Sequence, residues 1–226
     1  MSSLHLHWDS SKKINARNET IVAAWHKIFE APISIDSQYW TLCGNSIDDG
    51  KMICDCEADQ LSKSGFIKLS QFYGVNYSKK IISGNRRVIQ NAHWYCGDFL
   101  NVISDAMARK KFNPAIINAD LTSMPVTACG YFSDLLLFLS YVKSDMMVVC
   151  NMVLEHQNIK KLSSDMEFVM NKLNSDSNFQ AALVKADWRR YDDWYKYNGT
   201  GNLMTTVMGT IIFYKKENDN FLVHKT

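Results

Sequence analysis

The chain has 226 residues with a formal net charge of +2, and 46% of its residues are hydrophobic and 21% are charged. This balance excludes wholesale disorder, and the near-neutral charge argues against a protein that wraps duplex nucleic acid through charge alone. The sequence has no apolar run long enough to span a membrane and no leader with a basic start. We therefore expect a soluble, cytoplasmic protein without a membrane partner.

The N-terminal part predicts a loose arm over residues 1–18 and a helix that starts after Asn18 and stops before Pro32. A polar loop is expected over 46–55. Apolar runs that end in glycine, asparagine or aspartate predict five strands, at 39–43, 72–75, 92–96, 114–119 and 145–154. The periodicity between and after them predicts helices over 57–64, 78–90, 99–109, 131–142 and 163–173. Two further strand-like runs, 194–197 and 207–215, are separated by the turn-rich sequence NGTGN.

Strands that alternate with helices at this spacing are typical of βαβ units and a parallel sheet. The last two strands have no helix between them, which indicates an antiparallel pair. The sequence thus predicts an α/β fold: a single Rossmann-like domain with a mostly parallel, seven-stranded sheet and a C-terminal antiparallel β-hairpin. We expect residues 1–35 to form an N-terminal arm and helix ahead of this domain, which takes up residues 36–226.

Several catalytic and metal-binding signatures are absent from the sequence. It has no P-loop, no G-x-S-x-G nucleophile motif and no H-E-x-x-H pair, so nothing supports a nucleoside triphosphatase, a hydrolase or a zinc protease. Cys54 and Cys56 stand without a second pair at zinc-ribbon spacing, whereas Cys43, Cys96 and Cys150 lie in apolar runs. We therefore expect free cysteines and no metal site.

Each of the first four predicted strands ends in small or polar residues. In an open α/β sheet, ligands bind beyond the carboxyl ends of the strands. One polar residue at such an end is ordinarily a helix cap, but four ends that converge in space are better explained by a polar ligand. The first strand ends at Gly44 and Asn45, and the second ends at Asn76 and Tyr77. The third ends at Gly97, Asp98 and Phe99, and the fourth ends with Asn118 and Asp120.

This order of strands and helices, closed by a hairpin, resembles the class I S-adenosylmethionine-dependent methyltransferases over about residues 36–216. Gly97, Asp98 and Phe99 in WYCGDFL look like the third-strand motif, whose acid contacts the adenine amino group. The run NADLTSMP at 118–125 sits where the family has its fourth-strand motif, nearest the methyl group. The resemblance implies S-adenosylmethionine as the cofactor, held by Gly44, Asn45, Asn76, Tyr77, Gly97, Asp98 and Phe99.

Two departures from the family pattern keep an alternative open. The glycine-rich loop after the first strand is missing, since LCGNSIDDG has only Gly44 and Gly50. Asn76 stands where the family usually has an acid that holds the ribose hydroxyls. These departures favour a catalytically inactive, methyltransferase-like binding or partner subunit, which is the alternative to a methyltransferase.

Within the resemblance, Asp120 is the candidate that orients or deprotonates the methyl acceptor, with Asn118 as its hydrogen-bonding neighbour. Asp120 fits equally well as a helix cap. The motif is not D/N-P-P-Y/F, which enzymes that methylate the amino groups of bases use. Methylation of a base amino group is therefore the less favoured reaction.

The methyl acceptor is the least constrained part of the prediction. The segment DWRRYDDWYKYNGTG carries Arg189, Arg190, Trp194, Tyr195 and Tyr197, a combination that suits single-stranded nucleic acid, although alternation also fits a half-buried strand. We rank nucleic acid first and a small molecule or protein second, with a protein partner or a homo-oligomer also open. Other basic clusters, at 79–80, 86–87 and 109–111, are interpreted as solvated helix faces.

Overall fold

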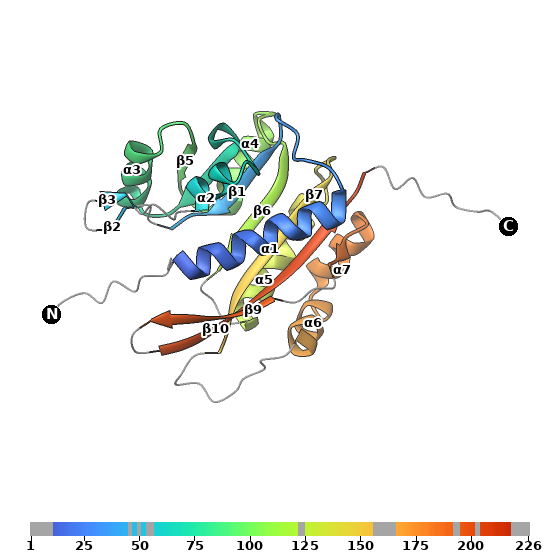
Figure 1. Cartoon of the computed structure of the whole chain (residues 1–226). Helices are drawn as coiled ribbons and strands as arrows, with labels where there is room; N and C mark the ends of the chain where they lie inside the picture. Colours follow the sequence, from blue (N-terminus) through green and yellow to red (C-terminus); the bar gives the residue numbers. More distant parts are fainter. Residues whose placement is uncertain are drawn as a thin grey trace.

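Five parallel strands form the centre of the protein, seen in a computed structural model that describes residues 11–44, 47–48, 51–52, 57–121, 125–155, 166–191, 195–201 and 204–217. They lie in the order β5-β4-β1-β6-β7 (Figure 1). The order reverses between β1 and β6, and ligands bind at such reversals in sheets of this kind. The strands are β1 (Gln38–Leu42), β4 (Phe72–Asn76), β5 (His93–Cys96), β6 (Pro114–Asp120) and β7 (Met146–Glu155).

The C-terminal strands close the sheet as predicted. β10 (Met204–Lys215) runs antiparallel to β7, while β8 (Arg189–Arg190) and β9 (Tyr195–Gly201) pair with different stretches of β10. Because β7 occupies one side of β10, β8 and β9 share the other side, and the sheet is seven strands wide. The mostly parallel sheet with its antiparallel hairpin is thereby confirmed. The strand β9 includes most of the NGTGN run that the sequence assigned to a turn.

Helices cover both faces of this sheet (Figure 1). One face packs against α1 (Ser11–Phe29), α2 (Glu57–Lys63) and α3 (Lys79–Val88). The other face packs against α4 (Phe99–Ala108), α5 (Pro125–Leu139), α6 (Met166–Asn174) and α7 (Ser177–Lys185). Strand residues alternate between the two cores, so Ile117 contributes to the α5 side and Ile116 to the α1 side. Among the described residues, no helix is long and apolar enough to cross a membrane.

Three local expectations were wrong. The first helix starts at Ser11 rather than after Asn18, because Asn18 is buried inside the helix and donates from Nδ2 to Gln60 Oε1 of α2 at 2.8 Å. The loop at 46–55 contains a short hairpin of β2 (Ile47–Asp48) and β3 (Lys51–Met52). Helix α7 was not predicted, although Asp176 caps it by accepting from the N–H groups of Asn178 and Phe179.

Two caps that were read from the sequence are present. The Ser78 side chain accepts from the Ile81 N–H at the start of α3, as predicted. Gly65 follows α2 with φ of +76°, the left-handed conformation that suits glycine after a helix. Packing requires glycine at another position, because a Cβ on Gly74 of β4 would lie 2.5 Å from the Trp94 ring. That contact leaves no room for a side chain between β4 and its neighbour.

Candidate functional site

The carboxyl ends of β1, β4, β5 and β6 lie at one edge of the sheet, since these strands are parallel neighbours. The register pairs Leu42 with Val75 and Asn76 with Cys96. Thr41 pairs with Asn118 across the switch point. The structure therefore brings together the strand ends that carry Gly44, Asn76, Tyr77, Gly97, Asp98 and Asp120. Asn45 lies outside the described residues.

Asn76 ties the ends of β1 and β4 together. Its Nδ2 donates to the Cys43 carbonyl at 2.7 Å, and its Oδ1 accepts from the Ser78 N–H at 2.8 Å. The Asn76 carbonyl also accepts from the Gly97 N–H at 3.1 Å, which links the end of β5. One N–H and one lone pair of the amide remain for a ligand. A half-buried asparagine in this position holds three strand ends in place and still offers both a donor and an acceptor.

Asp98 follows β5 and is both a helix cap and a half-buried acceptor. Its Oδ1 accepts from the Asn101 N–H at 2.9 Å, which caps α4, and its Oδ2 accepts from the Tyr77 hydroxyl at 2.6 Å. The hydrogen bond to Asp98 raises the pKa of Tyr77, whose side chain is 71% exposed. A carboxylate has about four acceptor positions, so two contacts leave room for a further donor from a ligand.

The remaining strand-end residues differ in what they offer. The exposed Gly44 has a carbonyl that accepts from Asn85 Nδ2 at 3.0 Å, so β1 and α3 are joined at this point. Gly97 adopts φ of +157°, and a Cβ there would meet Val102 at 3.2 Å. The Phe99 side chain is buried in the core of the α4–α7 side. Phe99 was expected to contact the cofactor, but only its backbone faces the site.

Tyr131 of α5 belongs to the same neighbourhood, although the sequence placed it only in a buried helix. Its pKa is raised by burial and, to a smaller extent, by the charges of Asp98 and Tyr77. The half-buried Tyr131 phenol therefore interacts electrostatically with the Asp98 and Tyr77 pair. Its place as the single tyrosine of α5 was the signal that could have identified it.

A buried polar row runs under the site on the α1–α3 face. Glu57, the first residue of α2, accepts from the hydroxyls of Tyr39 and Thr41, the latter at 3.1 Å, and from Asn118 Nδ2 at 2.6 Å. Asn118 Oδ1 in turn accepts from Asn151 Nδ2 at 2.8 Å. Such a network is stable when its members are hydrogen-bonded, and it fixes one arrangement of the strands that carry it.

The row continues to β10, where the Thr210 hydroxyl donates to Asn151 Oδ1 at 2.5 Å. Asn118 is fully buried, so it supports β6 rather than facing a ligand. Asp120 lies two residues further on the same face of β6 and is half-buried at the strand end. The sequence analysis missed Glu57, Asn151 and Thr210. The signal for the last two was a lone polar residue inside an apolar strand.

Arg189 and Arg190, the basic pair interpreted as a nucleic-acid contact, do not lie at the strand ends that form the site. β8 pairs with Phe213 and Tyr214, and Phe213 pairs with Val148 near the start of β7. Because β10 runs antiparallel to β7, the carboxyl end of β10 lies at the amino ends of the parallel strands. By contrast, β9 pairs with the first part of β10. That part of β10 lies beside the carboxyl-terminal half of β7, so β9, which carries Tyr195 and Tyr197, is at the same end of the sheet as the site.

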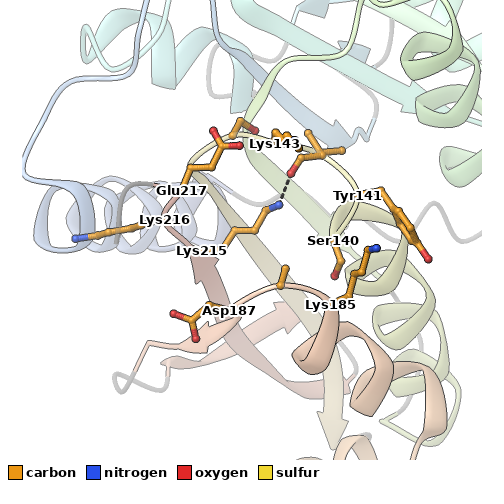
Figure 2. A pocket seen from close by; sticks show the side chains of 11 residues that line it. Ser140, Tyr141, Lys143, Lys185, Asp187, Lys215, Lys216 and Glu217 are labelled. Atoms are coloured by element: carbon orange, nitrogen blue, oxygen red, sulfur yellow. Dashed lines mark hydrogen bonds between the residues drawn. The ribbon is translucent and has the colours of Figure 1, made fainter. Parts of the chain in front are cut away.

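A pocket of about 410 Å³ also lies at the amino end of the sheet, away from the strand ends described above (Figure 2). Lys215 points into it and donates from Nζ to the carbonyls of Leu139 and Val142, with the Trp188 ring centroid 5.5 Å away. Burial lowers the pKa of Lys215. None of the predicted site residues that the structure describes lines this pocket. In the described part of the chain, no cluster of histidine, cysteine and acidic residues could hold a metal ion.

Comparison with known proteins gives only distant neighbours. No protein-family model matches the sequence, and no curated protein is detectably similar to it. A solved TehB-like SAM-dependent methyltransferase from Corynebacterium glutamicum is 12% identical, covers 89% of this chain and 100% of its own, and has a TM-score of 0.36.

A second solved structure is the Haemonchus contortus phosphoethanolamine N-methyltransferase 2 with phosphomonomethylethanolamine and S-adenosylhomocysteine. It is 10% identical over 92% of this chain and 61% of its own, with a TM-score of 0.39. Both proteins are methyltransferases, and at these identities the likeness concerns the fold alone. The α/β fold of this chain rests on its own strand order, a mostly parallel Rossmann-like sheet closed by antiparallel C-terminal strands.

Proposed function

We propose that the chain is an S-adenosylmethionine-dependent methyltransferase whose site lies at the carboxyl ends of β1, β4, β5 and β6. One observation carries the proposal: a parallel sheet closed by an antiparallel hairpin, with the accessible carboxylate of Asp98 at the end of β5. These are the features on which the resemblance to class I methyltransferases rests. The switch point between β1 and β6 adjoins this edge.

The residues at the strand ends suit the cofactor. Asp98 has acceptor positions for the adenine amino group, and Asn76 has a free donor and acceptor for the ribose hydroxyls. The exposed backbone at Gly44 allows close approach to β1. S-adenosylmethionine supplies a methyl group on a sulfonium centre, which an aligned nucleophile can accept. The chain's contribution is therefore mainly binding and alignment.

Asp120 is the residue proposed to orient the acceptor and take its proton. It stands at the end of β6 beside the switch point, and its backbone pairs with Asn151 of β7. Asn118 is proposed as a positioning residue that acts through the buried row and keeps the end of β6 in register. Alignment of this kind accounts for a large part of the rate in a reaction with a reactive methyl donor.

Titration calorimetry tests the cofactor part of the proposal. We expect the wild-type chain to bind S-adenosylmethionine and S-adenosylhomocysteine. Asp98→Ala should lose about tenfold to a hundredfold in affinity, as for loss of a charged hydrogen-bond partner. Asp105→Ala is the matched control, because Asp105 is an exposed residue of the same helix that pairs with Arg109. Equal affinity of the two variants, or no binding at millimolar ligand, would contradict the proposal.

A catalytically inactive binding module is the second candidate. The observation that favours it is Asn76, an amide already engaged with Cys43 and Ser78 at the position where the family has an acid. Transfer of a tritiated methyl group separates the two. We propose single-stranded nucleic acid as the acceptor, so RNA and DNA pools are the first substrates, with small molecules and proteins next. Cofactor binding without transfer to any pool, and without any effect of Asp120→Asn, supports the binding module.

A further inference from the structure

The edge of the sheet at β5 carries a larger net positive charge than the whole chain does. Residues 72–113 contain seven lysines and arginines and only two aspartates, a net charge of +5 against +2 for the whole chain. The rest of the molecule is therefore slightly acidic. Four of these cations lie on α3, and the other three lie in the turn that follows α4. They are Lys79, Lys80, Arg86, Arg87, Arg109, Lys110 and Lys111.

These cations are not explained by ion pairs. Within the described part of the chain, Arg109 is the member of this set that has a carboxylate partner, Asp105 at 2.8 Å. A solvated helix face ordinarily mixes both signs of charge, whereas α3 has no acidic residue. The sequence-based interpretation as solvated helix faces therefore leaves the single sign of the charge unexplained.

Three of the cations stand where local helix energetics do not favour them, whereas Arg86 and Arg87 lie in the last turn of α3, where the helix dipole favours cations. Lys79 and Lys80 begin α3, and the positive end of a helix dipole disfavours cations there. Lys110 adopts φ of +56° directly after the cap residue of α4, a position where helices commonly have glycine. A lysine at that position costs conformational energy relative to glycine. At Lys79, Lys80 and Lys110, a positive charge is therefore present at a cost in local helix stability.

A stack of aromatic rings crosses β1, β4 and β5 on the α4 side of the sheet. The His93 ring stacks on Tyr73 with centroids 4.3 Å apart, and Tyr73 stacks on Trp40 at 4.6 Å. Tyr95 lies parallel to Tyr73 within 6° and contacts Trp40. Trp40 is fully buried, which anchors the stack, while His93 is exposed and Tyr95 is 38% exposed. The outer rings form a rigid aromatic surface at the edge of the sheet.

Two arginines of the set interact with residues of β5. Arg86 of α3 reaches along β5 and donates from Nη2 to the Trp94 carbonyl at 2.8 Å. Burial raises the pKa of Tyr95, and the neighbouring Tyr73 raises it further. The charge of Arg109 lowers this pKa, so Arg109 interacts electrostatically with the Tyr95 side chain. Arg86 and Arg109 therefore place positive charge beside β5, whose exposed rings are His93 and Tyr95.

We infer that the β5 edge, formed by His93, Tyr95, the four cations of α3 and the three in the turn after α4, binds single-stranded nucleic acid. Unpaired bases stack on the exposed rings, and the lysines and arginines neutralise the phosphates along the strand. Base stacking requires unpaired bases, so the partner is single-stranded rather than duplex. The surface concerns binding alone, so the inference stands apart from methyl transfer. It also replaces Arg189 and Arg190 as the nucleic-acid contact.

Fluorescence anisotropy with labelled 20-nucleotide single strands of mixed-sequence RNA and DNA tests the inference on the full chain. We expect binding at 50 mM salt that weakens about tenfold or more by 200 mM salt, because phosphate contacts release counterions. A triple variant with Arg109, Lys110 and Lys111 changed to glutamine should lose about tenfold or more in affinity at 50 mM salt. The matched control changes Lys143, Lys185 and Lys216 to glutamine. These three lysines surround the pocket at the amino ends of the parallel strands, and the charge change is the same (Figure 2).

Variants of Tyr95 separate stacking from charge. Tyr95→Phe keeps the ring and should bind as the wild type does, whereas Tyr95→Leu keeps apolar bulk and should lose about fivefold or more, in keeping with the loss of one stacked base. Circular dichroism and urea unfolding verify that each variant is folded and as stable as the wild type, whether or not the chain binds the proposed cofactor. Equal losses in the two triple variants, equal affinities of Tyr95→Phe and Tyr95→Leu, or no oligonucleotide binding at 50 mM salt would each overturn the inference.

Discussion

Glu57 offers the sharpest test of the buried polar row. Its carboxylate accepts from Tyr39, Thr41 and Asn118, all of which are buried. Glu57→Ala removes the acceptor and leaves three buried donors without it, at a cost of about 1–3 kcal/mol for each unsatisfied group. Relaxation around the smaller side chain reduces that sum, so we expect a loss of about 3–5 kcal/mol, as for a broken buried ionic contact. Such a loss is a large part of a typical domain stability of about 5–15 kcal/mol.

Urea unfolding followed by circular dichroism measures this loss. Glu57→Gln keeps one carbonyl oxygen and the side-chain volume, so we expect a smaller loss of about 1–2 kcal/mol; this variant also remains useful if Glu57→Ala does not fold. Glu19→Ala is the control, because Glu19 is an exposed residue of α1 and its loss should change stability by less than about 0.5 kcal/mol. If Glu57→Ala falls within about 1 kcal/mol of Glu19→Ala, the row does not support the strands as described.

Three further outcomes are expected. Gly74→Ala should destabilise the fold by about 1–3 kcal/mol through overpacking, whereas Gly130→Ala, in an open helical position, should stabilise it by about 0.5–1 kcal/mol; urea midpoints that move in the same direction would contradict this. Cys96 is exposed, while burial raises the pKa of Cys129 to about 11, so alkylation at pH 8 followed by peptide mass spectrometry should label Cys96 before Cys129. Burial lowers the pKa of Lys215, so the unfolded chain binds more protons between that lowered value and about 10.4. The stability of the wild type relative to Lys215→Met should therefore rise with pH in this window, and a fall would contradict the burial of the ammonium.

The parallel part of the fold was predictable because its strands are buried on both faces. Such strands are continuous apolar runs, and the prolines, glycines and caps around them are local signals, as at Ser78 and Gly65. The hairpin followed from two strand-like runs with no helix between them. These features depend on short segments of sequence, so no knowledge of distant contacts was needed.

The errors arose where a distant contact decides the structure. The first turns of α1 are polar and give no helical periodicity, and Asn18 is buried only because Gln60 of α2 lies against it. The position of Arg189 depends on the antiparallel direction of β10, which sends β8 to the amino ends of the parallel strands. A sequence pattern does not show which end of a sheet a short strand will join.

The candidate site was predictable as a set of strand ends but not in its details. Asp98 and Asn76 were identified from their place after apolar runs, and the structure brings them to one edge. The role of Asn118 could not be derived from sequence, because its partners Glu57 and Asn151 come from α2 and β7. The aromatic surface at β5 was missed for a similar reason, since its rings come from three separate strands.

Chemical-shift mapping of the full chain during titration with S-adenosylhomocysteine tests the central proposal most directly. Backbone amide signals report where a ligand binds, whatever the methyl acceptor is. We predict shifts confined to the strand ends and the adjoining α5 turn, at residues 43–44, 76–78, 97–99, 120–121 and 130–132. Shifts that cluster instead around the pocket at residues 140–144, 185–187 and 215–217, or no shifts at millimolar ligand, would contradict a cofactor site at the carboxyl ends of the strands.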